Sequence, residues 1–336
     1  MTVKHQANGA RAQQMPALPR SLDFAARRAA SLGMTSRAAV LRMTGAALRL
    51  TVVTMGMMLL SAATAGAQQK IDRQMPLNAM GLLRITNLLG SVRITGWDKD
   101  SVSVSGSSSP GAQFYMGGTP VGVKLGVEAE RMPGAETADL VIRVPVRARI
   151  WVRTADGDVD VTGFSGDLDI AAINSRIRVK GTLKQALLET LSGDVELTAS
   201  PDYLRIRTGA GRVAWSGSSE DVAITTVSGG ITVAGGVVAR GRFESVTGDV
   251  RFSGSTPPTG SLAFDTHAGD IDVGLAKGVQ AHVSAAAISL DLFGSRSTQA
   301  LGGTPGTSAI TIGGKGFSGA TVVARSFKGK VVFTQP

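Results

Sequence analysis

Apolar residues recur along the chain with a period of 18 residues. One column of apolar positions is spaced by 18 residues four times and then by 19, 21 and 17, and it consists of Val159, Ile177, Val195, Val213, Ile231, Val250, Ile271 and Ile288. A second column lies seven residues earlier and keeps the same register through Val152, Ile170, Leu188, Ile206, Ile224, Phe243 and Phe264. Two columns in one register predict a repeated structural unit.

Within each repeat, apolar residues alternate with polar or small ones, as in Val195-Glu196-Leu197 and Leu204-Arg205-Ile206. This period of two predicts strands with one buried face. A small residue marks the corner between the two strands of each repeat, and these residues are Gly157, Ser175, Gly193, Gly211, Gly229, Gly248 and Gly269. Glycine tolerates the positive φ that a sharp corner often requires.

A single repeat of this kind cannot bury its apolar face alone, but stacked repeats can. We therefore expect an all-β protein, a single-stranded β-solenoid (β-helix) with rungs of about 18 residues and two short strands in each rung. The alternative is a β-sandwich, which would show antiparallel hairpin spacing and less uniform turns.

Charged residues recur just after the corners and predict a structural ladder. The ladder consists of Asp158, Arg176, Asp194, Arg212, Asp249 and Asp270. The signs alternate over the first four positions, and opposite charges on adjacent strands contribute about 0.2–1 kcal/mol per pair. A calcium or catalytic carboxylate site would not place arginine between its ligands. Asp270 and Asp272 are not interleaved with arginine in this way, which leaves weak cation binding open there.

Most of the formal net charge of +10 belongs to the first 67 residues, which hold eight Lys or Arg and one acidic residue. The rest of the chain shows little sign of a basic face, so we expect no nucleic-acid partner. Arg42 and Arg49 precede an apolar run at 50–60, and Ala65-Gly66-Ala67 follows it. This order predicts a secretory signal peptide cleaved after Ala67. The alternative is an uncleaved anchor, for which the run is short.

The leader therefore spans 1–67, and its true start is one of Met1, Met34 and Met43. The 43 glycines, the few aromatic residues and the absence of cysteine suit an exported, turn-rich β protein. The remaining chain divides into a short linker at 68–76, an N-terminal rung and β excursion capping the solenoid at 77–150, regular rungs at 151–293, a Gly/Ser/Thr-rich loop at 294–316, and a C-terminal rung and cap at 317–336.

Candidate chemistry is sparse. His267 lies near Asp265 and Asp270 in sequence, but only two histidines follow the leader and both fall inside the repeat. No His or Cys spacing fits a metal site. We therefore expect no enzyme activity, no catalytic residue, no metal and no cofactor. Phe114 and Tyr115, in a loop at 105–120, are the candidate ligand-contact residues.

Three stretches resemble a known family. The run IxNxxGSVxIxGWDxDSVxVxG (85–106) resembles the opening motif of the bacterial "putative adhesin" family of β-strand repeat proteins, domain-of-unknown-function family 4097. Residues 141–170 resemble its middle section, and the closing SAITIGGKG and VVARSFKGKVVF resemble its end. The resemblance covers about 77–334 and implies an exported β-solenoid commonly labelled an adhesin, with no site residues to carry over.

Two functional hypotheses follow. The first is a non-enzymatic exported adhesin or cell-envelope binding protein, at the cell surface or in the periplasm, whose partner is an envelope protein or a glycan. The second is a periplasmic structural scaffold that docks an envelope partner. A polysaccharide-active β-helix enzyme is the least favoured hypothesis. After signal cleavage we expect no integral membrane segment.

Overall fold

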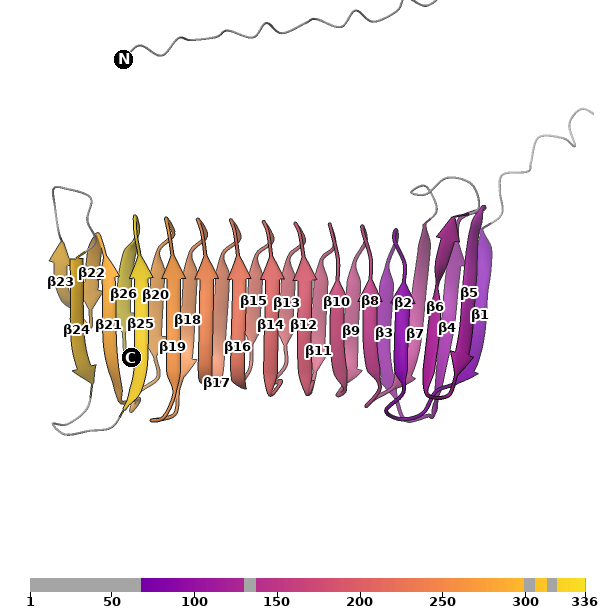
Figure 1. Cartoon of the computed structure of the whole chain (residues 1–336), viewed down its shortest axis with the longest axis horizontal. Coiled ribbons are helices and arrows are strands. Elements are labelled where there is room, and N and C mark those ends of the chain that lie inside the picture. Colours follow the sequence, from indigo (N-terminus) through magenta and orange to yellow (C-terminus); the bar gives the residue numbers. More distant parts are fainter. Residues whose placement is uncertain (1–67, 130–136, 299–305, 313–318, 336) are drawn as a thin grey trace, which may run out of the picture. The chain divides into compact units, whose positions relative to one another are not determined.

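The computed structural model describes residues 68–129, 137–298, 306–312 and 319–335. Over these ranges the chain forms 26 strands and no helix, so the all-β prediction is confirmed (Figure 1). Nothing in the described ranges has the length and hydropathy of a membrane-crossing helix. The predicted leader, its cleavage site and its possible start residues lie outside the described residues.

The strands form two sheets, named sheet A and sheet B. In spatial order, sheet A contains β1 (Gln69–Pro76), β4 (Ser101–Ser108), β7 (Ala138–Pro145), β3 (Val92–Trp97), β9 (Val159–Phe164), β11 (Ile177–Gly181), β13 (Val195–Thr198), β15 (Val213–Ser216), the first part of β17 (Ile231–Ser245), β18 (Val250–Ser255), β20 (Ile271–Leu275), β26 (Lys330–Thr334), β22 (Ser289–Leu292) and β23 (Ser295–Thr298).

Sheet B lies opposite, and most of its strands alternate along the chain with those of sheet A. In spatial order it contains β5 (Ala112–Thr119), β6 (Gly122–Ala129), β2 (Leu82–Thr86), β8 (Arg149–Arg153), β10 (Asp167–Ala171), β12 (Gln185–Thr190), β14 (Tyr203–Thr208), β16 (Ser219–Thr226), the second part of β17, β19 (Ser261–Thr266), β25 (Ala320–Ser326), β21 (Ala281–Ala287) and β24 (Gly306–Ile312).

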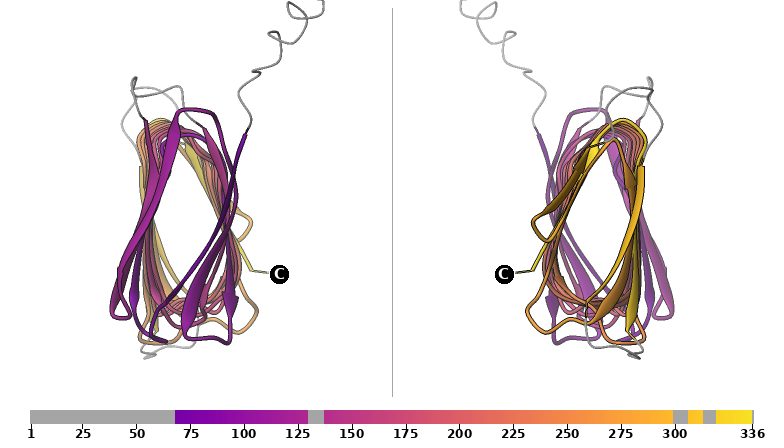
Figure 2. Two further views of the ribbon diagram at one scale, coloured as in Figure 1. Left: turned by 90° about the vertical axis from the view of Figure 1, so that its right-hand side faces the viewer. Right: turned by 90° about the vertical axis from the view of Figure 1, so that its left-hand side faces the viewer.

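Strands of neighbouring rungs pair in parallel, and in the middle of the stack the paired residues are 18 positions apart. Ile177 pairs with Val195, and Val195 pairs with Val213. Viewed along the stack, the two sheets face each other and meet at the corners (Figure 2). This is a solenoid-like arrangement, because each rung contributes one strand to each sheet.

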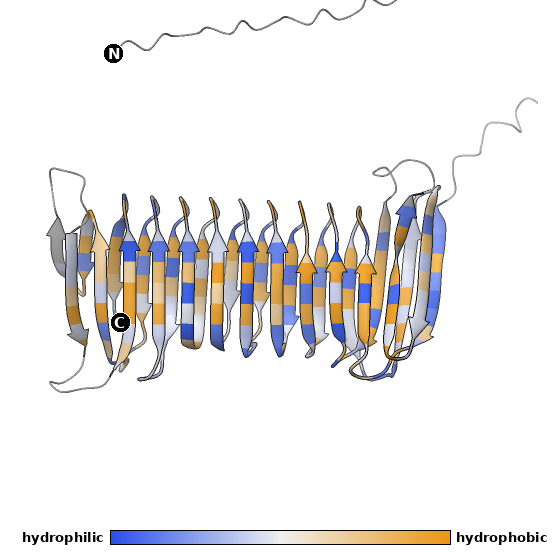
Figure 3. Ribbon diagram, in the orientation of Figure 1, coloured by the Kyte–Doolittle hydropathy of each residue, from blue (hydrophilic) through white to orange (hydrophobic). Residues whose placement is uncertain are grey.

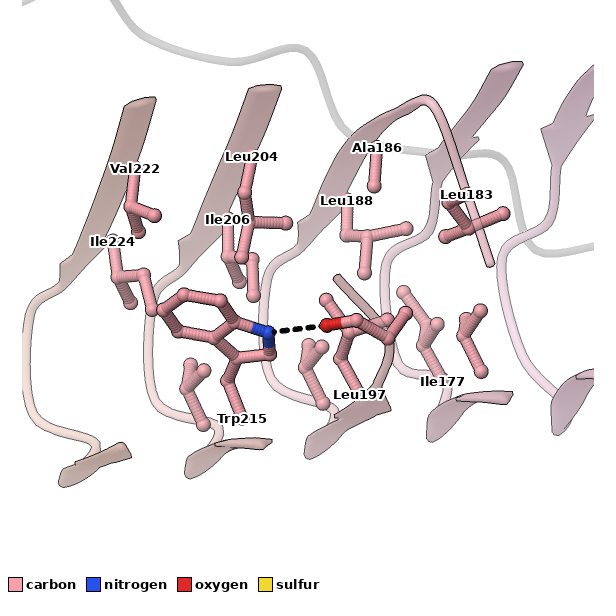
Figure 4. Close-up of a cluster of buried hydrophobic side chains, with 14 of the residues drawn as sticks. Ile177, Leu183, Ala186, Leu188, Leu197, Leu204, Ile206, Trp215, Val222 and Ile224 are labelled. Atoms are coloured by element: carbon pink, nitrogen blue, oxygen red, sulfur yellow. Dashed lines mark hydrogen bonds between the residues drawn. The ribbon is translucent and has the colours of Figure 1, made fainter. Parts of the chain in front are cut away.

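The core fills the space between the sheets with the inward-facing side chains of both. In β13, Val195 and Leu197 are buried while Glu196 is exposed, and the same alternation of apolar and polar residues runs along the other strands (Figure 3). Figure 4 shows Trp215, which is 1% exposed, among aliphatic side chains of both sheets. Its indole N–H donates to the Ala199 carbonyl at 3.0 Å, so the buried ring leaves no polar atom unpaired.

The corner glycines are required chiefly by the close approach of neighbouring rungs. A Cβ on Gly193 would lie 1.7 Å from the carbonyl oxygen of Ser175, and one on Gly211 would lie 1.8 Å from that of Gly193. Of the predicted corner glycines only Gly157 has a positive φ, of 133°. The expected reason for glycine, backbone conformation, was therefore wrong at most corners, and the contact between rungs explains the residue instead.

The N-terminal end of the stack differs in part from its prediction. Residues 68–76, expected to be a linker, contain β1, which pairs antiparallel with β4. Ile71 is 5% exposed and Met75 packs against the core, so these two residues hold the strand in place. Polar residues surround them, which hides the strand in the sequence pattern. Strands β1, β4 and β5, all in antiparallel pairs, lie beyond the parallel rungs at this end.

At the other end, the C-terminal rung does not lie last in the stack. Strand β25 pairs in parallel with both β19 and β21, and β26 pairs with both β20 and β22. The rung therefore lies between two rungs that precede it in sequence. The outermost strands are β23 and β24, which pair antiparallel with β22 and β21 and fall in the segment 294–316 expected to be a loop. Parallel pairing on both sides buries the C-terminal rung, so it is not the cap.

Candidate binding surfaces

The aromatic pair that the sequence analysis placed in a ligand-contact loop lies on a strand. Phe114 and Tyr115 belong to β5, which pairs antiparallel with β6. Phe114 is half-buried and packs against the core, while the Tyr115 ring lies over the backbone of Gly126. Neighbouring residues of a strand point to opposite faces. The expectation of an exposed aromatic pair on a loop is therefore wrong.

The charges near the corners form ion pairs between rungs. The Arg176 guanidinium lies 3.7 Å from the Asp158 carboxylate. Arg178, two residues along, lies 2.9 Å from Asp160 and 3.4 Å from Asp158, and it reaches Glu196 at 4.0 Å. The hydrogen bond to Asp160 raises the pKa of Arg178, which keeps the guanidinium charged. Carboxylates and guanidinium groups of these three rungs thus neutralise one another, whereas among the described residues Arg212, the next basic member of the ladder, forms no ion pair.

Asp270 and Asp272, the aspartates that are not interleaved with arginine in the sequence pattern, also have basic partners. Lys330 of the C-terminal rung lies 3.7 Å from Asp270. Arg251 lies 3.6 Å from Asp272 and 3.0 Å from Asp249. Across the described ranges, no three His, Cys, Asp or Glu side chains are placed to hold a metal ion.

Corner carboxylates also bind the backbone of the next rung. Asp194 accepts the backbone N–H of Arg212 at 2.8 Å, and Asp249 accepts that of Asp270 at 3.0 Å. Asp270 in turn accepts the N–H of Lys330 at 2.9 Å. A corner N–H points away from the strand ladder, so the carboxylate supplies the acceptor that the sheet does not. The ladder residues thus have a role in stacking.

Buried hydroxyls form a second ladder that the sequence analysis missed. At six successive corners the side-chain oxygen of a Thr or Ser accepts the backbone N–H of the glycine three residues later, at 2.8–3.2 Å. The hydroxyl residues are Thr190, Thr208, Thr226, Ser245, Thr266 and Ser326. Their recurrence three positions before each corner glycine was a visible signal in the sequence.

Apolar side chains project from the same corners and form what we call the corner ridge. They are between 45% and 63% exposed, and they are Leu88, Ile173, Leu191, Val227, Val246 and Phe327. Backbone hydrogen bonds join some neighbours of the row directly, such as Leu191 N–H to the Ile173 carbonyl at 3.0 Å and Val246 N–H to the Val227 carbonyl at 3.1 Å, while Gly209 lies between Leu191 and Val227. Since several exposed apolar residues on one edge are uncommon in a monomer, the corner ridge is a candidate contact surface.

A hollow of about 560 Å³ adjoins the C-terminal part of the corner ridge. His267 and Phe327 line it with stacked rings whose centroids are 5.2 Å apart, and Val246 lies on the same side. The outward residues Asp265 and Arg325 form its polar border. The His267 side chain is otherwise exposed.

A second cavity, of about 310 Å³, lies on the outer face of sheet B, and we call it the sheet B groove. Its polar and aromatic lining comes from four neighbouring strands, β8, β10, β12 and β14, and consists of Arg149, Trp151, Asp167, Asp169, Gln185, Tyr203 and Arg205. The two rings lie at opposite ends because they occupy the first and fourth strand, about 14 Å apart at the usual strand spacing. Trp151 is 42% exposed and Tyr203 is 38% exposed.

Both rings of the groove are held by arginine. The Arg84 guanidinium lies 4.7 Å from the centre of the Trp151 ring. The Arg205 guanidinium lies 4.6 Å from the centre of the Tyr203 ring, and its Nε donates to the Tyr203 hydroxyl at 2.7 Å. A ring fixed in this way is pre-organised for a ligand, because less side-chain freedom is lost on binding.

The carboxylates of the groove are not used by the fold. Within the described residues, the side chains of Asp167 and Asp169 take part in no hydrogen bond or ion pair. The pKa of Asp169 is raised above its usual value, chiefly by burial. The nearby Arg153 acts in the opposite direction, and Glu189 adds to the increase. Two half-buried carboxylates with free oxygens between two aromatic rings can accept hydrogen bonds from a ligand.

Comparisons with known proteins find solved structures of low sequence identity. A structure described as a "putative lipid binding protein" from Parabacteroides distasonis is 9% identical, with a TM-score of 0.43 over 81% of this chain and 98% of that chain. A "putative adhesin" from Parabacteroides merdae is 7% identical, with a TM-score of 0.41 over 81% of this chain and 97% of that chain. No curated protein matches the chain.

A further "putative adhesin", from Bacteroides fragilis, is 10% identical, with a TM-score of 0.36 over 80% of this chain and 98% of that chain. The family model described as Toastrack DUF4097 matches residues 87–306, which is more than half of the sequence. The resemblance seen in the sequence motifs is confirmed, and the chain belongs to the Toastrack DUF4097 family.

Proposed function

We propose that this protein is a non-enzymatic, exported binding protein, an adhesin or a cell-envelope binder, that holds its ligand in the sheet B groove. In this proposal the protein is a single-stranded β-solenoid whose rungs of about 18 residues carry two short strands each. The parallel pairing of residues 18 positions apart supports that description. The rungs act as a rigid support for side chains on the outer face of sheet B.

The sheet B groove is the observation that carries the proposal. It combines a cavity, two exposed rings and two carboxylates without partners, whereas the carboxylates of the corner ladder all have partners. Exposed aromatic residues that serve no packing role are typical of binding surfaces. The lining of the groove includes no histidine, and its two carboxylates, Asp167 and Asp169, both lie on β10.

Binding of the purified protein to isolated envelope material and to intact cells tests this function. Trp151→Ala should lower the captured fraction at least about fivefold, because truncation of a binding-site ring usually removes more than about 1 kcal/mol. Val237→Ala is the matched control, since Val237 is also exposed, at 48%, but does not line the groove. Equal capture by both variants and the parent protein would overturn the proposal.

A second candidate function is a periplasmic scaffold that docks an envelope protein. The corner ridge favours it, because a row of apolar side chains along several rungs suits the apolar face of a protein partner. Leu191→Ser, at the most exposed ridge position (63%), should abolish cross-linking to that partner and leave capture through the groove unchanged. Loss of capture in Trp151→Ala alone would exclude the scaffold as the main role.

The site of action, cell surface or periplasm, is tested by protease treatment of intact and permeabilised cells. Cleavage of the native protein on intact cells is the result expected for an adhesin. Protection until the outer membrane is permeabilised is the result expected for a periplasmic binder or scaffold, and it would overturn the surface location.

A further inference from the structure

The geometry points to a ligand class for the sheet B groove: we infer that it binds a neutral oligosaccharide chain lying across strands β8 to β14. This inference rests on the proposed function, since it names the ligand of the same site. It is carried by the kind, order and charge of the side chains in the groove.

The rings at the two ends match the apolar faces of sugar rings. A sugar presents C–H groups on its faces and hydroxyls around its edge, so an exposed aromatic ring can pack against the face. Trp151 and Tyr203 keep about two fifths of their surface exposed even with the arginine contacts. Because the rings are separated by about 14 Å, one ring system cannot contact both, whereas a chain of linked sugars can.

The polar groups between the rings match sugar hydroxyls. In the column that contains Trp151, the next strand contributes Asp169, and in the adjacent column Asp167 and Gln185 lie in register with Tyr203. A carboxylate accepts up to about four hydrogen bonds and an amide both donates and accepts, which suits ligands with several hydroxyls. These side chains line the groove on β10 and β12, the two strands between those that carry the rings.

The charge balance of the groove favours a neutral ligand. The negative charges of Asp167 and Asp169 lie in the same groove as the positive charges of Arg149 and Arg205. Arg205 also forms an ion pair with Asp221 at 3.4 Å. An anionic ligand would meet two carboxylates. An organic cation placed against either ring would be repelled by the guanidinium group that lies over it, whereas a neutral sugar carries no charge and can pack on the part of each ring that remains exposed. A polyhydroxylated neutral molecule meets neither obstacle.

Titration of the full chain with defined neutral oligosaccharides, a cello-oligosaccharide and a chito-oligosaccharide, tests the inference by calorimetry. At least one should bind, and Trp151→Ala should weaken it by at least about fivefold, the smallest loss typical when a stacking ring is removed. Asp169→Asn keeps the size of the side chain and should weaken binding about tenfold through loss of a charged acceptor. Phe327→Ala, which lines the other hollow, is the control and should bind like the parent protein.

Each contrary result has a distinct meaning. Binding of spermidine or of a uronic-acid oligosaccharide, but of neither neutral probe, would overturn the neutral-sugar inference. So would sugar binding that is lost in Phe327→Ala and kept in Trp151→Ala. If no probe binds while Trp151→Ala still lowers capture of envelope material, the sugar inference fails and the proposed function stands. If Trp151→Ala and Asp169→Asn change neither measurement, both fail.

Discussion

The contribution of the buried corner hydroxyls to stability can be tested at Thr226. The exposed Thr225 next to it provides a control of the same residue type. Thr226 is 1% exposed and accepts the Gly229 backbone N–H at 3.0 Å. Its hydroxyl also lies 3.4 Å from the Gly209 carbonyl. Thr226→Val keeps the shape of the side chain and removes this hydroxyl. Thr225, one residue earlier, points out of sheet B into solvent.

The expected magnitude follows from which backbone groups lose a partner. The Gly209 carbonyl keeps hydrogen bonds from the N–H groups of Val227 at 3.0 Å and Ser228 at 2.9 Å. The Gly229 N–H loses its acceptor in a buried position. Leaving one buried donor without a partner costs about 1–3 kcal/mol, so Thr226→Val should lower the free energy of unfolding by that amount. Thr225→Val should change it by less than about 0.5 kcal/mol.

Urea unfolding followed by circular dichroism measures both variants against the parent protein, and thermal unfolding provides a second readout. For a chain of more than 250 residues the midpoint should fall by about 2 °C per kcal/mol or less. Equal stability of Thr226→Val and Thr225→Val, within about 0.5 kcal/mol, would refute the idea that the hydroxyl ladder stabilises the corners.

Three further outcomes are expected. Gly193→Ala should destabilise the protein by at least about 1–3 kcal/mol in urea unfolding, because its Cβ would clash with a carbonyl, whereas Gly117→Ala has open space and should be tolerated. Hydrogen bonds from the Ser91 hydroxyl and N–H lower the pKa of Asp139 in the folded protein. The ionised Asp139 therefore stabilises the fold above the pKa that it has in the unfolded chain, and this stabilisation is lost as the pH falls through its pKa in the folded protein. Asp139→Asn should therefore be less stable than the parent at pH 7, with the difference shrinking below about pH 4, and a constant difference would contradict this cause. Val195→Asp would bury an unpaired charge at a position 0% exposed, so the protein should fail to fold, and an unchanged melting temperature would exclude the pairing of Val195 with Ile177 and Val213.

The alternation of apolar and polar residues made the strands predictable. Val195 and Leu197 are buried and Glu196 is exposed, as the pattern indicates. The ladder charges were also readable, because Arg176 follows Asp158 by 18 residues and the two side chains form an ion pair. In both cases the information lies in residues at a short or constant separation, and a stacked repeat brings such residues together.

Contacts between rungs were harder to predict, because their reason lies in the packing. The corner glycines suggested a backbone conformation, yet Gly193 is required by the carbonyl of Ser175 in the neighbouring rung. The position of the C-terminal rung could not be derived from chain order, since β25 inserts between β19 and β21. A strand edge accepts any strand of matching register, and the pattern along the chain does not specify which strand that is.

The sequence by itself determined the all-β class, the two-residue alternation that separates core from surface, and the charged corners, because each depends on local periodicity. Only the tertiary structure decided what the outer face of sheet B presents. Trp151 and Tyr203 belong to different rungs, and the stacking of β8, β10, β12 and β14 places Asp167 and Asp169 between them. The groove depends on outward side chains from several rungs, which the apolar period leaves unconstrained, so it emerges only when the rungs are packed together.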